Sequence, residues 1–312
     1  MRFISLSLLA VSIFIVSCGH LKMARQKFDE KDYAQTIDIC RTSIEQDSTD
    51  AKAYFLLGSA FIEIDSLYQA EEALERALYL EPDNEQFKQK LDGLYFTIAD
   101  TLIQNEALRE AIPFYEKSLG LYKANPSAFE KKADVFTKMG KYDEAKSFYK
   151  KALINTTDST RVLSKLDDLQ TDEKTARKLL EKGIRKRETK QYEQAVVRFE
   201  KALDLKPDFK EAKYQKHIAK GLNWYKQGSK SDLWEAIMQF GQAAAIYPSR
   251  GEPHYFMGLA YNKKDRDEYT NAIDELDKAV ALNPDGPFAE KARKKATEIR
   301  KRKIKMEEFW GQ

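Results

Sequence analysis

Small and bulky side chains recur along this chain in a motif that appears seven times. In each copy a small residue stands seven positions before another small residue, with a bulky residue four positions after the first. Positions i, i+4 and i+7 lie on one face of a helix, so each copy predicts an amphipathic helix whose small residues let a neighbouring helix approach closely. In chain order the seven triplets are Thr36, Cys40 and Ser43; Ala70, Leu74 and Ala77; Ala111, Tyr115 and Ser118; Ala145, Tyr149 and Ala152; Ala195, Phe199 and Ala202; Ala236, Phe240 and Ala243; and Ala272, Leu276 and Ala279.

The motif has a regular period. Its copies are 34, 41, 34, 50, 41 and 36 residues apart, which is a period of 34 with insertions. Most copies have a second helical stripe upstream, as in residues 51–84, where Gly58 and Ala60 alternate with larger apolar side chains. Proline, which cannot continue a helix, ends several units. Each period therefore predicts two antiparallel helices joined by a short turn, and the fixed period predicts stacked units that offer a binding surface rather than a catalytic pocket.

This pattern resembles the tetratricopeptide repeat (TPR), a 34-residue helix-turn-helix with a stripe of small and aromatic residues and a proline near its end. The resemblance is strong in 51–84 and 126–159, good in 176–209 and 251–286, and weaker in 17–50, where Thr36 and Ser43 replace alanines. It implies an all-α fold: a right-handed α-solenoid of about seven TPR units with a C-terminal capping helix. The family implies no single activity.

Insertions and the ends of the array complete the predicted organisation. About seven extra residues in the units near 85–125 and 210–250 predict longer first helices or turns. Residues 160–175 carry a helical apolar stripe and predict an inserted helix or a hinge. The predicted segments are 1–17, a signal peptide that is removed; 18–159, units 1–4; 160–175, the insertion; 176–286, units 5–7; and 287–312, a basic capping helix.

The N-terminus predicts export and a lipid anchor. Arg2 precedes an apolar stretch, Phe3 to Val16, which is too short to cross a bilayer comfortably and is typical of a signal peptide. The tetrad 15–18, Ile-Val-Ser-Cys, resembles the bacterial lipobox, which implies acyl chains such as palmitate on Cys18 and permanent attachment to a bacterial membrane. The residue after the cysteine is Gly19 and not Asp, which favours the outer membrane, facing the periplasm. An ordinary signal peptide with an unrelated cysteine, or a short uncleaved anchor, is the alternative.

The net charge of +3 conceals two halves of opposite sign. From Cys18 to Thr160 there are 19 Lys and Arg against 25 Asp and Glu, and from Arg161 to the end 33 against 25. Two basic stretches form a predicted patch for anionic lipid, envelope polymer or acidic protein; a solvated helix face is the alternative. Export makes nucleic acid an unsuitable partner. The patch residues are Arg177, Arg185, Lys186, Arg187, Arg300, Lys301 and Arg302.

Catalytic chemistry is not indicated. The three histidines, His20, His217 and His254, are not at i, i+4 spacing, and no His/Cys cluster has zinc spacing. No glycine-rich phosphate loop or nucleophile elbow is present. The sequence therefore predicts no enzyme, no metal and no cofactor. Cys40 occupies a bulky core position and is expected to pack there; without a lipid on Cys18, a Cys18–Cys40 disulfide becomes conceivable.

In TPR arrays the first helix of each unit lines a concave face, and the resemblance therefore implies a set of partner-binding residues. These are Phe55, Leu56, Ile62, Phe96, Ile103, Tyr255, Phe256 and Leu259. Exposed aromatic patches favour a peptide or helix in the groove. The alternative is that the array buries these residues, or that the capping helix covers Tyr255 and Phe256.

The predicted function is a membrane-anchored scaffold or adaptor that binds protein or peptide partners in the bacterial cell envelope. One alternative is a structural subunit of an outer-membrane assembly or secretion complex. Another is a binder of anionic envelope polymer or lipid through the basic C-terminal half. The sequence leaves the oligomeric state open.

Overall fold

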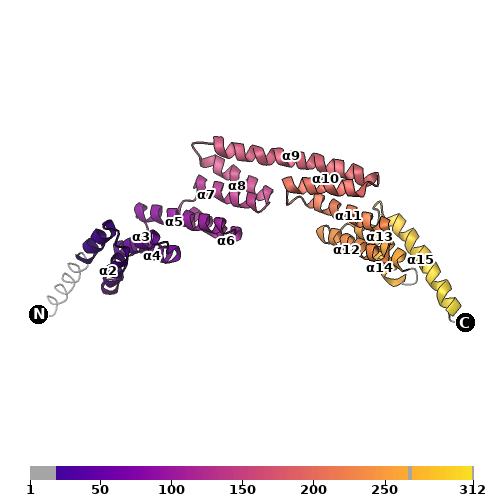
Figure 1. Ribbon diagram of the computed structural model, residues 1–312, viewed down its shortest axis with the longest axis horizontal. Coiled ribbons are helices and arrows are strands. Elements are labelled where there is room, and N and C mark those ends of the chain that lie inside the picture. The colour runs from indigo at the N-terminus through magenta and orange to yellow at the C-terminus, as the bar shows by residue number, and fades with distance from the viewer. Residues whose placement is uncertain (1–18, 266–268, 311–312) are drawn as a thin grey trace. The chain divides into compact units, whose positions relative to one another are not determined.

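The computed structural model describes residues 19–265 and 269–310, and over these ranges it contains helices and no strands (Figure 1). Residues 19–29 are helical and precede the first labelled element. The labelled helices are α2 (Tyr33–Gln46), α3 (Ala51–Glu63), α4 (Leu67–Leu80), α5 (Glu85–Gln104), α6 (Leu108–Leu121), α7 (Pro126–Lys138), α8 (Tyr142–Asn155), α9 (Thr160–Glu188), α10 (Tyr192–Leu205), α11 (Lys210–Gln227), α12 (Lys230–Ile246), α13 (Gly251–Lys264), α14 (Tyr269–Leu282) and α15 (Ala289–Trp310). The predicted signal peptide and Cys18 lie outside the described residues.

The chain forms two compact units. One contains the residues up to Met139 together with Asp143–Ser164, and the other contains Gly140–Tyr142 and the residues from Lys165 onward. Within each unit consecutive helices pack on one another, from α2 through α7 in the first and from α10 through α15 in the second. The all-helical prediction, with successive paired helices, is confirmed.

The seven predicted triplets form the centre of the helix pairs. Every one of their 21 residues is at most 2% exposed. The two hydroxyls of the first copy, which replace alanines, find acceptors: Thr36 donates to the Asp32 carbonyl oxygen at 2.8 Å, and Ser43 donates to Asp50 at 3.4 Å. Because a buried hydroxyl is costly only when it lacks a partner, this first repeat keeps the fold despite its weaker sequence match.

Glycine in the first helix of a pair allows close approach by the bulky residue of the second helix. A Cβ atom on Gly58 would stand 2.7 Å from Cγ of Leu74, and one on Gly183 would stand 2.5 Å from the Phe199 ring. Gly258 faces Leu276 in the same way. The bulky residue thus fills the space left by a small residue on the preceding helix of its own unit. Gly221, opposite Phe240, is a further case that the sequence pattern did not single out.

The turns between paired helices share one backbone conformation. Lys31, Asp65, Glu106 and Lys190 have φ between 59° and 61°, and Gly140 has φ 70°. Each stands five positions before the first small residue of its triplet. This left-handed conformation is strained for residues with a Cβ, so at four of these five residues the turn geometry prevails over the residue's own backbone preference.

The insertions lengthen helices. The helix α5 has 20 residues where α3 has 13, and α11 and α12 have 18 and 17. Residues 160–175 are helical and continue without interruption into 176–188, so that α9 has 29 residues. The helix α15 covers the end of the second unit, where Ala292, Ala296 and Ile299 pack on Leu276. Among the described helices, none is both long and apolar enough to span a bilayer.

Candidate partner-binding surface

The predicted groove residues of the first unit are packed among their neighbours. The ring of Phe55 on α3 stacks on Phe87 of α5, with centroids 4.7 Å apart, and Leu56 is 8% exposed. Phe96 meets Tyr115 edge to face at 5.5 Å. Ile103 belongs to the same cluster as Phe96, and Ile62 is half-buried. These side chains therefore bury much of their apolar surface within the array.

The predicted residues of the second unit form an aromatic cluster. Tyr255 and Phe256 on α13 lie 5.3 and 5.5 Å from the ring of Phe288, which immediately precedes α15, and Phe256 also stacks on Phe240 at 5.3 Å. Leu259 is half-buried. This geometry favours the interpretation in which the capping segment covers the two rings, through Phe288. Partner binding by these residues stays a prediction.

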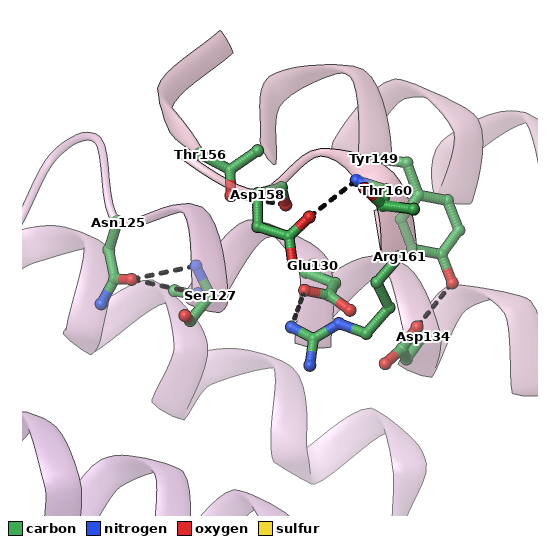
Figure 2. A network of polar contacts seen from close by, with 10 residues as sticks. Asn125, Ser127, Glu130, Asp134, Tyr149, Thr156, Asp158, Thr160 and Arg161 are labelled. Atoms are coloured by element: carbon green, nitrogen blue, oxygen red, sulfur yellow. Dashed lines mark hydrogen bonds and ion pairs between the residues drawn. The ribbon is translucent and has the colours of Figure 1, made fainter. Parts of the chain in front are cut away.

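In the first unit, polar side chains on α7 are occupied by internal contacts (Figure 2). Arg161, near the start of α9, places its guanidinium 2.5 Å from the carboxylate of Glu130, which is 6% exposed. The Tyr149 hydroxyl donates to Asp134 at 2.5 Å. Asn125 caps α7 by accepting from the Ser127 amide at 3.1 Å. A partner at this position would have to displace existing pairs, so this stretch offers little free binding capacity.

A buried tyrosine hydrogen-bonded to a carboxylate recurs in successive helix-pair repeats. Tyr115 donates to Asp100 at 3.1 Å with a sequence separation of 15, the same separation as in the pair formed by Tyr149 and Asp134. Lys131 also contacts Asp100, at 3.2 Å. Burial, together with the adjacent carboxylate, raises the pKa of Tyr115, so that its hydroxyl stays protonated and keeps donating.

Most of the basic patch is engaged. Arg177 pairs with Glu173 at 2.8 Å, and Arg187 pairs with Glu252 at 2.8 Å. Further contacts join Arg300 to Asp277, Arg302 to Asn262 and Lys186 to Gln191. Arg185 and Lys301 form no ion pair with a residue that the structure describes. Three of the seven residues, Arg187, Arg300 and Arg302, thus take part in contacts between helices, which weakens the case for a dedicated polyanion site.

His217, His254 and Cys40 are packed against neighbouring side chains. His217 Nδ1 lies 2.9 Å from Gln239 Oε1, and burial lowers the pKa of this histidine. His254 lies 2.7 Å from Glu275. Cys40 is free, and burial, with a contribution from Asp50, raises the pKa of its thiol to about 12. Within the described ranges, no cluster of three or more His, Cys, Asp or Glu residues is arranged to hold a metal ion.

Exposed apolar side chains occur elsewhere than predicted, mainly on second helices. Tyr79 is 73% exposed and Ile154 is 78% exposed, whereas each of the eight predicted groove residues is buried or half-buried. A sequence signal was available, because these residues are apolar but lie off the i, i+4, i+7 stripe of their helix. Others of this kind are Tyr68, Val197, Trp234, Met238 and Leu282.

The fold and these surfaces define an all-helical protein of repeated helix pairs. TPR family models match residues 27–91, 93–125 and 126–153, so the first half of the chain carries tetratricopeptide repeats. Among curated proteins, tetratricopeptide repeat protein 37 of Xenopus laevis is 25% identical over 277 residues, which is 86% of this chain. The chain spans only 17% of the length of that relative.

Two solved structures show the extent of the structural likeness. The TPR domain of P58(IPK) aligns over 92% of this chain and 98% of its own length, with 15% identity and a TM-score of 0.42. A tetratricopeptide repeat protein from Parabacteroides merdae aligns over 90% and 98%, with 12% identity and a TM-score of 0.36. The matched family models describe repeats and not a catalytic domain.

Proposed function

We propose that this protein is a lipid-anchored scaffold that gathers protein or peptide partners in a bacterial cell envelope, on the periplasmic side of the outer membrane. The scaffold part is carried by one observation, the presence of tetratricopeptide repeats, because proteins of this family generally mediate protein–protein interactions.

The anchoring part of the proposal rests on the sequence. The apolar stretch Phe3 to Val16 is followed by Cys18, and two or more acyl chains on this cysteine would make attachment effectively permanent. Cys40 does not compete for this role, because it is buried in the first repeat. The acyl chains would supply location, and the repeat surfaces would supply specificity.

Metabolic labelling with an alkyne analogue of palmitate tests the anchor. We expect label on the wild-type protein and on the Cys40→Ser control, and none on Cys18→Ser, because only Cys18 follows the lipobox pattern. Equal label on wild type and Cys18→Ser would refute the anchor and leave the repeat scaffold as a separate question.

Crosslinking in the native envelope, followed by mass spectrometry, tests the scaffold. We expect several partners at variable stoichiometry. A single partner at fixed stoichiometry would instead identify a structural subunit of an envelope complex, and the absence of any crosslinked protein would refute both.

A further inference from the structure

A cavity of about 710 Å³ lies among α2, α3 and α4, on a face of α3 other than the predicted groove. The helix α3 contributes Tyr54, Leu57 and Phe61, which are at i, i+3 and i+7 and so share one face, whereas the groove prediction used Phe55, Leu56 and Ile62. A volume of this size is in the range of roughly 300–1,000 Å³ that small-ligand pockets occupy.

The base of this cavity is apolar and its rim is aromatic and cationic. Leu57, Phe61 and Ala73 line the cavity and are 8%, 6% and 5% exposed, so these packed side chains form its apolar base. Tyr79 on α4 also lines the cavity and is 73% exposed. An apolar side chain entering here would gain contact with the floor and an aromatic neighbour at the rim.

Two guanidinium groups that line this cavity have no carboxylate partner among the described residues. Arg41 lies 5.9 Å above the ring of Phe61, and Arg76 lies 6.0 Å from the Tyr54 ring and 5.0 Å from the Tyr79 ring. Neither arginine forms an ion pair or side-chain hydrogen bond with any described residue. The rings hold the two cations by cation–π attraction and leave their N–H donors available.

The second unit contains a completed version of this arrangement. Arg250 lies 4.4 Å from the Tyr214 ring and 4.0 Å from the Tyr247 ring, as Arg76 lies over two tyrosines. In addition, its two terminal nitrogens contact the two oxygens of Glu211 at 3.1 and 2.7 Å. Arg250 shows that a guanidinium held over two tyrosines can also bind a carboxylate in a bidentate manner, which favours a carboxylate as the ligand of Arg76.

The acidic groups of the cavity limit how much negative charge it accepts. Glu75 is already bound by Lys117 at 3.0 Å and by the Tyr95 hydroxyl at 2.9 Å, so it does not serve Arg76. Glu72 lies one helical turn before Arg76 and also lines the cavity. The carboxylate of Glu72 would repel a polyanion more strongly than it repels a ligand with a single carboxylate.

We propose that the cavity of α2, α3 and α4 binds a short peptide segment in which an apolar side chain, best an aromatic one, stands beside one carboxylate. The apolar side chain fills the floor at Leu57 and Phe61, and the carboxylate pairs with Arg76 and Arg41. This inference rests on the proposed peptide-binding function and assigns it a specific surface and ligand chemistry.

Titration of the purified full chain with capped peptides tests this site. The probes are acetyl-Gly-Phe-Glu-Gly-amide, its Gln analogue and its Ala-for-Phe analogue, with dissociation constants measured by ligand-observed NMR. We expect the Phe-Glu peptide to bind about tenfold more tightly than the Gln analogue, because a charge-assisted hydrogen bond is replaced by a neutral one. The Ala analogue is expected to lose affinity by a similar factor.

Variants locate the effect. In Arg76→Gln we expect the preference for the Glu peptide over the Gln peptide to fall below about twofold, because the variant lacks the guanidinium that distinguishes a carboxylate from an amide. The control is Arg109→Gln, an exposed arginine on α6 outside the cavity, which should keep the full preference. Circular dichroism verifies that both variants remain folded.

Two results would overturn the proposal: no binding of the Phe-Glu peptide at millimolar concentration, or an undiminished Glu preference in Arg76→Gln. Tighter binding of poly-glutamate than of the single-carboxylate peptide would also contradict it. If these peptides fail while crosslinking still recovers envelope partners, the cavity assignment is wrong and the scaffold function stands.

Discussion

At the scale of single residues, close packing between paired helices depends on the absence of a side chain at a few glycines. The ring of Phe199 occupies the position that a Gly183 Cβ would need, and Leu74 does the same opposite Gly58. Glycine is otherwise a poor helix former, so its presence here reflects the space that the bulky residue requires. The pattern of small and large residues thus specifies which helix faces meet.

Substitution of Gly183 by alanine is expected to destabilise the protein by about 1–2 kcal/mol, because overpacking costs about 1–3 kcal/mol and exceeds the helix propensity gained. The matched control is Gly93→Ala on α5, where a Cβ meets nothing within 4 Å; it should stabilise by up to about 1 kcal/mol. Denaturant unfolding measures both. Equal effects of the two substitutions on the free energy of unfolding would show that the contact with Phe199 does not determine the cost of a side chain at Gly183.

The sequence predicted these residues well and the partners of charged residues poorly. All seven triplets could be recognised because helix periodicity links i, i+4 and i+7 to one buried face. The pair formed by Arg187 and Glu252 could not, since 65 positions separate these residues and only the stacking of helices brings them within 2.8 Å. The arginines of the proposed cavity share this difficulty, because Arg41 and Arg76 come from different repeats.

At the scale of helices, ion pairs join one repeat to the next. Arg250 precedes α13 and pairs with Glu211 on α11. Burial raises the pKa of Glu211, but hydrogen bonds from Arg250 and Gln215 outweigh this and leave the pKa below its ordinary value of 4.5. The folded state therefore favours the charged carboxylate. The pair contributes stability above pH 4.5 and loses it as the pH falls through the lowered pKa of the folded state.

The variant Glu211→Gln is expected to be less stable at pH 7 by about 1–3 kcal/mol, because the partly buried guanidinium keeps a weaker acceptor. Below pH 4.5 the difference from wild type should shrink, since protonation removes the same charge from the native residue. Thermal unfolding between pH 3 and 7 measures this, with Glu193→Gln, an exposed residue of α10, as the control. A difference that stays constant with pH would contradict the assignment.

Helix lengths were also predictable only in part. The extra residues near 85–125 and 210–250 were visible in the spacing, and they appear as the longer helices α5, α11 and α12. The spacing could not tell whether residues 160–175 form a separate helix, because helical periodicity does not mark where one helix ends without a capping signal. In the structure they continue into 176–188. A hinge there remains a prediction.

At the scale of the whole molecule, a chain of stacked pairs is held together by contacts between neighbours, so local damage should stay local. Ile299 on α15 is fully buried against Leu276 and its neighbours, whereas Ile304 on the same helix is 53% exposed. The exposure of the predicted groove residues could not be predicted from the sequence, because it depends on the packing of the whole array. Tyr255 and Phe256 are covered by Phe288, a contact that depends on how the capping segment folds back.

We expect Ile299→Asp to increase amide hydrogen exchange in α13, α14 and α15 and to leave α3, α4 and α5 unchanged, because the buried charge disrupts only adjacent packing. The control Ile304→Asp should resemble wild type throughout. Hydrogen exchange measured by mass spectrometry resolves these segments. Loss of protection across the whole chain would show that the array unfolds as one cooperative body.

The recurring left-handed turn offers a way to tune the protein without altering its recognition surfaces. Lys31, Asp65, Glu106 and Lys190 occupy a conformation that glycine adopts freely, as Gly140 does at the equivalent position. These four sites belong neither to the buried triplets nor to the walls of the cavity. Replacing these four turn residues by glycine, one repeat at a time, is therefore a route to a more stable sensor or display scaffold.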